Sequence, residues 1–269
     1  MGGDFHIAFD GVHLTLGRRP VFRGLSCGFV RGQVTVVLGG SGAGKSTLLR
    51  LVGGLERADA GTVRVAGEDV SRLPERQLFR VRERLGMLFQ GGALLDSMTV
   101  YDNVALPLRE HTDKTEAEIA AEVNRRLGDV GLPDVGDLYP RHLSGGMARR
   151  AALARSVVMN PEIVLCDEPF SGLDPLNVRR VEGLLVDLSR RRGLTLVVTS
   201  HHLASSLRMA DRIVFLVDGH AVSGTPQDLL QNEDRRIVAF LAAEVDPNFD
   251  SARIAEERAV RDAAGRGRA

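Results

Sequence analysis

Cysteine and net charge are both scarce in this sequence. Cys27 and Cys166 are the only cysteines among 269 residues, too few for a disulfide framework or a thiolate metal cluster. We therefore predict that both are reduced residues that pack in the interior. Lysine and arginine together number 35, as do aspartate and glutamate, so no overall charge favours nucleic acid or an anionic membrane surface.

Long apolar runs are also missing. The longest, such as Leu194–Val198 and Ile213–Val217, fall far short of the roughly 20 residues that span a bilayer. The first ten residues, Met1–Asp10, lack the basic start and apolar stretch of a secretory signal. We expect a cytosolic chain that does not cross a membrane by itself. Its apolar content, 43%, is enough to bury the core of one compound domain.

Four apolar runs predict a parallel sheet. They are short, rich in β-branched residues and apolar on both faces, which is typical of strands that helices cover on both sides of a sheet. Their ranges are Gln33–Leu38, Glu162–Cys166, Thr195–Thr199 and Arg212–Val217. A helical pattern at Val178–Arg191 lies between two of them, so the sequence indicates an α/β core.

The N-terminal part has a different pattern. Phe5–Asp10, Val12–Leu16 and Thr62–Val65 have the alternation of hairpin-forming strands, separated by turn residues such as Gly11 and Gly61. We expect an antiparallel β subdomain beside the parallel core.

The middle of the chain predicts helices. Thr115–Leu127 begins with TEAE, which places a capping threonine before the acids of a first helical turn. We expect a helical subdomain at about residues 91–159 and one domain over residues 5–240. Residues 241–269 are polar and rich in alanine and arginine, so we predict a C-terminal extension that is partly disordered.

A glycine-rich loop carries the strongest chemical signal. Gly39–Ser46 fits G-x-x-x-x-G-K-[ST] between a predicted strand and a helix predicted at Ser46–Val52. Glycines let successive N–H groups point at phosphate oxygens, and the helix N-terminus adds positive potential. Lys45 supplies a charge for the β- and γ-phosphates, and the Ser46 hydroxyl would ligate Mg²⁺. The expected ATP-binding residues are Gly39, Gly40, Ser41, Gly42, Ala43, Gly44, Lys45, Ser46 and Thr47.

Lysine is nearly absent elsewhere. Lys45 and Lys114 are the only two, in a chain that otherwise uses arginine for its positive charges. An ammonium group fits inside such a loop where a planar guanidinium does not. The lysine at position 45 therefore indicates a need specific to that site.

Two acids follow the strand predicted at Glu162–Cys166. If that strand neighbours the phosphate loop, Asp167 would hold Mg²⁺ through its water shell. Glu168 would then accept a proton from, or orient, the water that attacks the γ-phosphate. By itself, an acidic pair after a strand is more often a solvated turn.

Further motifs decide between these two interpretations. The chain contains Gln90 after an apolar strand, LSGGM at Leu143–Met147, DEP at Asp167–Pro169, SGLD at Ser171–Asp174 and SHH at Ser200–His202. Together they resemble the ATP-binding-cassette (ABC) ATPases over about residues 5–240. The resemblance implies a P-loop NTPase fold with a RecA-like parallel-sheet core, an antiparallel β subdomain and a helical subdomain that carries LSGGM.

The resemblance also implies catalytic and metal-binding roles by position. Gln90 would touch Mg²⁺ and the attacking water, and His201 would contact the γ-phosphate. The catalytic residues would be Glu168, His201 and Gln90. Ser46, Gln90 and Asp167 would hold Mg²⁺.

The LSGGM segment implies a homodimer. By resemblance, Ser144, Gly145 and Gly146 would cap the γ-phosphate of ATP bound to a second copy, with Asp174 at the same seam. A serine hydroxyl and glycine N–H groups at the start of a helical run form an anion site in any case. The alternative interpretation is that this segment is an ordinary turn at the start of a helix and binds no phosphate.

Three positions depart from the family pattern. Met147 stands where glutamine is usual, His202 where aspartate is common, and Leu16 about where an aromatic residue stacks on adenine. Phe9 or Phe22 could stack on the base instead. An isolated phenylalanine near an early strand is more often a core residue.

The segment Gly91–His111 is the most informative part of the sequence about the substrate. With the flanking sequences VRERLGMLFQ and LSGGMARRAALARS, this segment resembles the ATPases of the maintenance-of-lipid-asymmetry (Mla) phospholipid transporters. The resemblance implies an ATPase peripheral to the cytoplasmic face of the inner membrane, attached only through a polytopic permease. Further implied partners are an MCE-type substrate-binding protein and sometimes a STAS-domain protein, with no role for nucleic acid.

Several alternatives stay open. The cassette could serve another apolar substrate, such as a sterol or another envelope lipid. A soluble cassette that acts on ribosomes or DNA would carry two cassettes, a coiled-coil insertion or a basic face, none of which is visible. A kinase or GTPase would leave LSGGM without a role. The tail Asp246–Ala269 could reach across a dimer or be dispensable.

Overall fold

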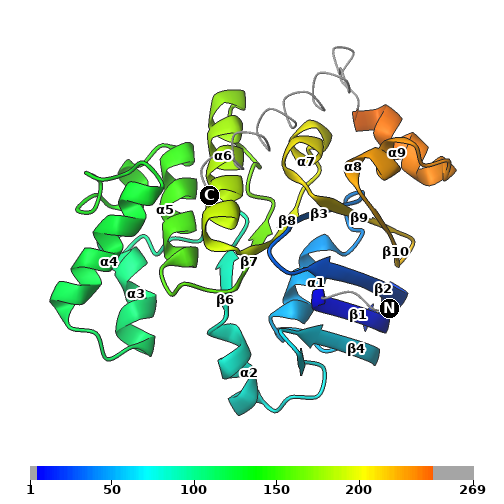
Figure 1. The fold of residues 1–269 in the computed structure, drawn as a ribbon, viewed down its shortest axis with the longest axis horizontal. Helices are drawn as coiled ribbons and strands as arrows, with labels where there is room; N and C mark the ends of the chain where they lie inside the picture. Colours follow the sequence, from blue (N-terminus) through cyan, green and yellow to red (C-terminus); the bar gives the residue numbers. More distant parts are fainter. Residues whose placement is uncertain (1–4, 245–269) are drawn as a thin grey trace.

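Two β-sheets and a set of helices build residues 5–244, the part of the chain that the computed structural model describes (Figure 1). The larger sheet has the strand order β10-β9-β3-β8-β7-β6. Its strands are β3 (Val34–Leu38), β6 (Leu85–Leu88), β7 (Ile163–Asp167), β8 (Thr195–Thr199), β9 (Arg212–Val217) and β10 (His220–Gly224). All neighbours pair in parallel except β10, which is antiparallel to β9. The four runs predicted as parallel strands are β3, β7, β8 and β9, so the α/β core is confirmed.

The smaller sheet is antiparallel and has the order β2-β1-β4-β5. Its strands are β1 (Phe5–Leu16), β2 (Arg19–Val30), β4 (Ala60–Val65) and β5 (Glu68–Asp69). This confirms the predicted antiparallel part. Strand β2, which pairs with the whole length of β1, was not predicted from the sequence.

Gly11 and Gly61 are strand residues and not turns, which corrects the sequence prediction. Gly11 has φ +57° and lies where the register of β1 shifts against both neighbours, and its N–H donates to Ser26 Oγ at 2.9 Å. In β4, a Cβ on Gly61 would come within 2.3 Å of the Gly11 carbonyl oxygen. The two glycines thus serve a β-bulge and a close backbone approach. Consequently, the two predicted N-terminal strands form one continuous strand.

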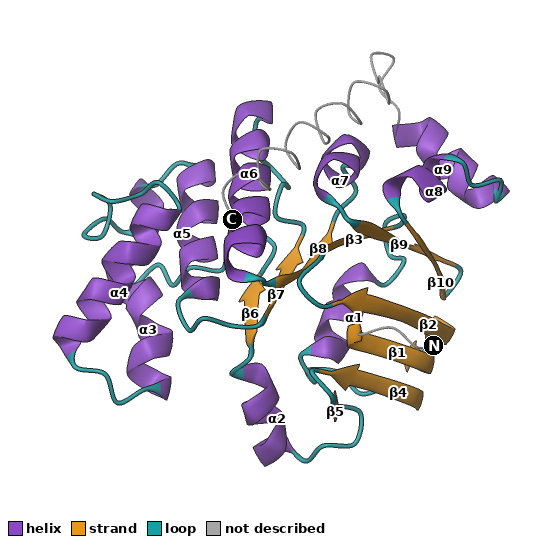
Figure 2. Ribbon diagram, in the orientation of Figure 1, coloured by secondary structure: helices purple, strands orange, loops and turns teal. Residues whose placement is uncertain are grey.

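Helices surround the larger sheet and fill the span between β6 and β7. Figure 2 shows only helices and loops in that span, where α3, α4 and α5 lie together on one side of the molecule. They are α3 (Val100–His111), α4 (Glu116–Asp129), the 3₁₀ helix η1 (Pro140–His142) and α5 (Gly145–Val157). The others are α1 (Lys45–Val52), α2 (Glu75–Arg82), α6 (Pro175–Arg192), α7 (Leu203–Met209), α8 (Pro226–Leu230) and α9 (Arg235–Glu244).

The start of α4 and the position of α9 test two of the sequence predictions. The capping box predicted from TEAE is confirmed: Thr115 Oγ1 accepts from the Glu118 N–H, and the Glu118 carboxylate accepts from the Thr115 N–H. The boundary expected at residue 240 falls inside α9. Most of the predicted extension, residues 245–269, lies outside the described part of the chain.

None of the helices in residues 5–244 is both long enough and apolar enough to cross a bilayer.

Two hydrophobic cores explain why the parallel strands are apolar on both faces. In β3, Val34 and Val36 pack into the core shared with α3 to α7, whereas Val37 packs into the core shared with α1 and the smaller sheet. Strands β7 and β8 alternate in the same way, so every residue of these two strands is buried. Cys27 and Cys166 are free and buried, as predicted, and burial raises the pKa of the Cys27 thiol to about 12.

A cluster around Glu162 joins the two sheets at the start of β7. Arg84 donates from Nε at 2.7 Å and from Nη2 at 3.0 Å, and Arg31 donates from Nη1 at 3.1 Å. His6 Nε2 lies 3.3 Å from Glu162 Oε2. The bidentate bond to Arg84 is the main reason that the pKa of Glu162 falls to about 2.

We predict that Glu162→Gln lowers the free energy of unfolding by about 1 kcal/mol at pH 7, a value discounted for solvent exposure. Because the folded pKa is depressed, the carboxylate stabilises the fold above pH 4.5. That stabilisation is lost as pH falls toward 2. Urea unfolding should show the same difference in free energy of unfolding between the variant and the unmodified chain at pH 7 and pH 5, and a smaller difference at pH 3.5. A constant difference would contradict the charge-based account.

Candidate functional site

The carboxyl ends of three neighbouring strands meet at one edge of the larger sheet. The glycine loop follows β3, Thr199 ends β8, and Asp167 ends β7. Since β8 lies between β3 and β7 and all three are parallel, residues far apart in sequence converge there. The acidic pair predicted beside the phosphate loop therefore lies beside it.

Lys45 is the first residue of α1 and lies across the glycine loop. Its ammonium donates to the carbonyl oxygens of Gly39 at 2.9 Å and Gly40 at 3.3 Å. Lys45 Nζ also lies 3.6 Å from Glu168 Oε1, with both side chains about one-tenth exposed. The single charge of the loop is thus held between loop carbonyls and a carboxylate.

Ser46 and Asp167 present oxygen atoms next to that charge. The Ser46 hydroxyl donates to Asp167 Oδ1 at 3.0 Å. The Thr199 hydroxyl, which the sequence analysis missed, donates to the same oxygen at 2.7 Å. Within the described chain, Asp167 Oδ2 accepts no hydrogen bond. This arrangement leaves one carboxylate oxygen available to a ligand.

Glu168 is buried and contacts His201. His201 Nδ1 lies 2.8 Å from Glu168 Oε2, and the imidazole is half exposed. Glu168 itself has φ +46°, which is uncommon for a residue with a side chain and marks a strained position. The two sides of the Glu168 carboxylate therefore face Lys45 and His201.

Gln90 is not bonded to Lys45, Asp167 or Glu168 in the described chain. It is exposed beyond the end of β6 and forms no hydrogen bond to any residue of the part described. Two buried or half-buried arginines of α5 hold the segment around it, and sequence reasoning missed both. Arg149 donates to the carbonyl oxygens of Phe89 at 3.3 Å and Ser171 at 3.2 Å, and Arg155 donates to those of Gly92 and Ala93.

The predicted LSGGM residues occupy two environments. Ser144 and Gly145 are exposed at the start of α5, and Ser144 Oγ accepts from the Met147 N–H at 3.3 Å. Gly146 is buried, and a Cβ there would lie 2.4 Å from Asn177 Oδ1. Asn177 was also missed by the sequence analysis. Within residues 5–244, Ser144 forms no bond with the phosphate loop of its own chain.

Asp174 caps the start of α6. Its Oδ1 accepts from the N–H groups of Leu176 and Asn177, both at 3.1 Å. The Asn177 side chain donates to Oδ2 and is the main cause of the lowered pKa of Asp174. The starts of α5 and α6 are therefore adjacent, with Asn177 in contact with both Gly146 and Asp174.

Neither phenylalanine proposed to stack on adenine is accessible. Phe9 is 1% exposed and Phe22 is 2% exposed, and both pack in the core shared with the smaller sheet. That hypothesis is wrong, and the core interpretation is confirmed. Leu16 is 36% exposed, and Arg19 donates from Nη2 to the Gly42 carbonyl oxygen at 3.0 Å.

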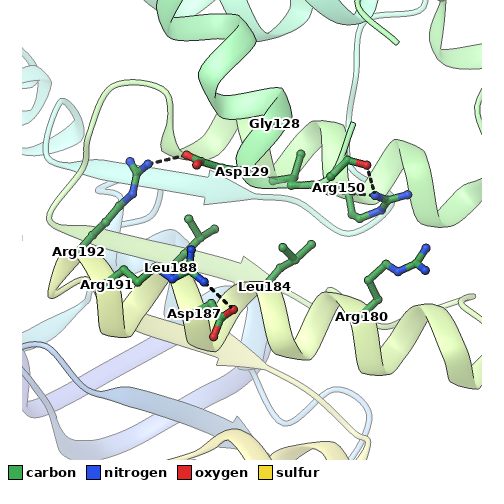
Figure 3. A pocket seen from close by; sticks show the side chains of 11 residues that line it. Gly128, Asp129, Arg150, Arg180, Leu184, Asp187, Leu188, Arg191 and Arg192 are labelled. Carbon is green, nitrogen blue, oxygen red and sulfur yellow. Dashed lines mark hydrogen bonds and ion pairs between the residues drawn. The ribbon is translucent and has the colours of Figure 1, made fainter. Parts of the chain in front are cut away.

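A cavity of about 800 Å³ lies between the end of α4 and the outer face of α6 (Figure 3). Arg150 in its wall donates from Nη1 to the carbonyl oxygens of Val130 and Gly131, both at 2.9 Å, and thereby caps α4. Arg192 bridges to Asp129 at 2.6 Å. These polar groups are used in holding helix ends, and none of the predicted site residues lines the cavity.

Residues 22–171, more than half of the chain, match the family described as "ABC transporter". The chain belongs to the ABC transporter family of ATP-binding proteins. As an ABC ATPase, it binds and hydrolyses ATP, which confirms the activity expected from the motifs.

This ABC ATPase covers most of the length of its curated relatives. It is 42% identical over 231 residues to the intermembrane phospholipid transport system ATP-binding protein MlaF of Haemophilus influenzae, covering 86% of this chain and 88% of that one. The MlaF of Escherichia coli K12 is equally similar, with 86% of each chain covered. The probable ribonucleotide transport ATP-binding protein mkl of Mycobacterium tuberculosis is 36% identical over 264 residues, covering 96% of this chain and 74% of that one. The resemblance to Mla ATPases is thereby confirmed.

Solved structures agree with the fold of this ABC ATPase. The cassette MJ0796, in a dimeric post-hydrolysis state bound to ADP and phosphate, has a TM-score of 0.75 at 27% identity. The match covers 82% of this chain and 98% of that one. Clostridium perfringens cbiO1, part of the transporter complex cbiONQ, has a TM-score of 0.79 at 24% identity, covering 90% and 96%. The predicted P-loop fold of the ABC type is confirmed.

Proposed function

We propose that two copies of this chain close face to face on two ATP molecules and drive phospholipid through a separate permease. The position of Ser144 carries the proposal. It is exposed at the start of α5 and, within residues 5–244, forms no bond with the phosphate loop of its own chain. A second copy would bring its Ser144 and Gly145 onto the γ-phosphate held by Lys45. The dimeric state of the related cassette MJ0796 supports this arrangement.

Mg²⁺ fits the oxygen atoms at the ends of β3 and β7. Carboxylate, hydroxyl, water and phosphate oxygens are the ligands that this ion prefers. We infer that Ser46 ligates it directly and Asp167 holds it through water, because Oδ2 accepts no bond from the described residues. Gln90, exposed at the end of β6, would join them. The bound ion would neutralise charge on the β- and γ-phosphates.

Glu168 is the proposed general base for the attacking water. Its carboxylate contacts Lys45 at 3.6 Å and His201 at 2.8 Å. The γ-phosphate carries more negative charge than one carboxylate, so it would draw both of these groups toward itself. That movement frees Glu168 to accept a proton from water while His201 contacts the phosphate. ATP binding and activation of the base would thus be one event.

We predict that Glu168→Gln lowers turnover at least about 100-fold, because the amide cannot accept the proton. ATP binding should persist, and the protein should accumulate as an ATP-bound dimer. Lys45→Ala, in contrast, should lose nucleotide affinity itself. Steady-state ATPase assays, equilibrium ATP binding and size-exclusion chromatography separate the two variants. Normal turnover by Glu168→Gln would remove Glu168 from the mechanism.

We predict that Ser144→Arg abolishes hydrolysis while an isolated subunit still binds ATP, because the arginine blocks the neighbour's site and leaves its own loop intact. Ser223→Arg, on the exposed edge strand β10, is the matched control and should remain active. Mixing Ser144→Arg with Lys45→Ala protein rebuilds one complete site in the mixed dimer, so the mixture should exceed the summed rates of the separate variants. A fully active Ser144→Arg protein would exclude the shared site.

Phospholipid is the proposed cargo because the MlaF relatives are named as phospholipid transport proteins. The chain would lie at the cytoplasmic face of the inner membrane, attached through a polytopic permease that contacts Gly91–Leu108. An MCE-type substrate-binding protein and a STAS-domain protein are the further proposed partners.

The mkl relative gives a second candidate cargo, since it is named a probable ribonucleotide transport ATP-binding protein. We expect the full chain, purified from membranes with its own permease, to carry phospholipid. Its ATPase rate should respond to added phospholipid and not to ribonucleotides. Mass spectrometry of the bound molecules and ATPase assays in vesicles provide the measurement. If sterol is bound, or if the ATPase rate responds to ribonucleotides alone, phospholipid is not the cargo.

A further inference from the structure

Thr199 lies at the point where the two acids of the site meet the central strand of the sheet. It is completely buried at the end of β8, directly opposite Asp167 in the pairing of β7 with β8. Its hydroxyl donates to Asp167 Oδ1 at 2.7 Å and accepts from the Glu168 N–H at 3.0 Å. One hydroxyl thereby contacts both proposed functional acids.

The geometry points to a specific role for each of these two bonds. Asp167 Oδ1 accepts hydrogen bonds from the hydroxyls of both Thr199 and Ser46, so the carboxylate is turned with Oδ1 toward these two groups. Oδ2 is left without a bond to the described residues, in the orientation suited to a hydrated cation. Removing the Thr199 hydroxyl would leave Ser46 as the remaining hydroxyl donor to that carboxylate.

The second bond acts on the backbone. The β7–β8 ladder ends at the Asp167–Thr199 pair, so the buried N–H of Glu168 has no strand partner. The Thr199 hydroxyl accepts from it, and at that residue the chain turns to φ +46°. This bond satisfies a group that would be costly to bury unpaired and stabilises the turn that aims Glu168 at Lys45 and His201.

We propose that Thr199 is a positioning residue for ATP hydrolysis, which orients Asp167 toward Mg²⁺ and Glu168 toward the attacking water. The inference rests on the proposed roles of those two acids. In this role Thr199 itself would contact neither the nucleotide nor the ion. Its effect passes through the two groups that its hydroxyl bonds. Outer-shell partners of this kind typically change metal affinity or activity about 10- to 100-fold when they are removed.

A structural explanation predicts a different result. Thr195 is a matched control, because it is also completely buried, lies at the opposite end of β8 and has a bonded hydroxyl. Its Oγ1 accepts from the Gly32 N–H at 2.9 Å and lies 2.7 Å from His6 Nδ1. Thr195→Val removes a comparable hydroxyl from the same strand, far from Asp167. If Thr199 only stabilised the fold, the two valine variants would behave alike.

The test compares Thr199→Val, Thr199→Ser and Thr195→Val in the full chain. We expect Thr199→Val to lower kcat about 10- to 100-fold and to raise the Mg²⁺ concentration for half-maximal activity about tenfold. Its ATP affinity measured in EDTA should change less than about threefold, since the phosphate loop is untouched. Thr199→Ser keeps a hydroxyl and should restore both values to within about threefold. Thr195→Val should leave both unchanged and lower only the melting temperature.

Rates are normalised to the ATP-binding sites measured in EDTA, so partly unfolded protein does not imitate a catalytic defect. The inference is overturned if Thr199→Val matches Thr195→Val in kcat and Mg²⁺ dependence. It is equally overturned if Thr199→Ser is as impaired as Thr199→Val. Glu168→Gln is measured alongside. An inactive Glu168→Gln with a normal Thr199→Val would remove this inference alone, whereas normal turnover by Glu168→Gln would remove the proposed function beneath it.

Discussion

Parallel pairing of β3, β8 and β7 is the constraint on which the rest of the site depends. It fixes which residues stand at the carboxyl edge of the sheet, and it places Thr199 opposite Asp167. The glycine loop leaves the neighbouring strand at the same edge. A helix begins there with Lys45, so the positive end of α1 and the ammonium both face the acids. No side chain of the site has to reach far, because the strand ends bring the groups together.

Helix α5 connects this edge to the rest of the helical region. Its start exposes Ser144, and Gly146 packs against Asn177 at the start of α6. Further along, Arg149 binds carbonyl oxygens on both sides of the site, one beside Gln90 and one in the loop after Glu168. Burial lowers the pKa of Arg149, and its hydrogen bonds go to neutral carbonyl oxygens. Arg155 of the same helix donates to the carbonyl oxygens of Gly92 and Ala93. The helix that we propose presents Ser144 to a second copy therefore also holds the start of the segment that we propose contacts the permease.

Charge in the site is balanced locally. Lys45 and His201 both contact Glu168, and Asp167 is held by two neutral hydroxyls. A buried carboxylate is tolerated only when such partners are present, because unpaired burial costs several kcal/mol per ion. When ATP and Mg²⁺ bind, Lys45 and His201 would contact phosphate in place of Glu168, and Asp167 would gain the metal ion and its water as a partner.

The sequence by itself determined the phosphate loop, the four central strands, the capped helix at Thr115 and the family. Each of these depends on a motif or a hydrophobic pattern of neighbouring residues. It did not determine strand β2, whose glycines at positions 24 and 28 and proline at position 20 interrupt the usual strand pattern. Only the tertiary structure decided that Gly11 and Gly61 meet across two strands and that Phe9 and Phe22 are core residues. It alone joined Thr199 to acids 31 and 32 residues away in the chain. The physical reason is that contacts across a sheet depend on strand order and register, which local periodicity does not encode.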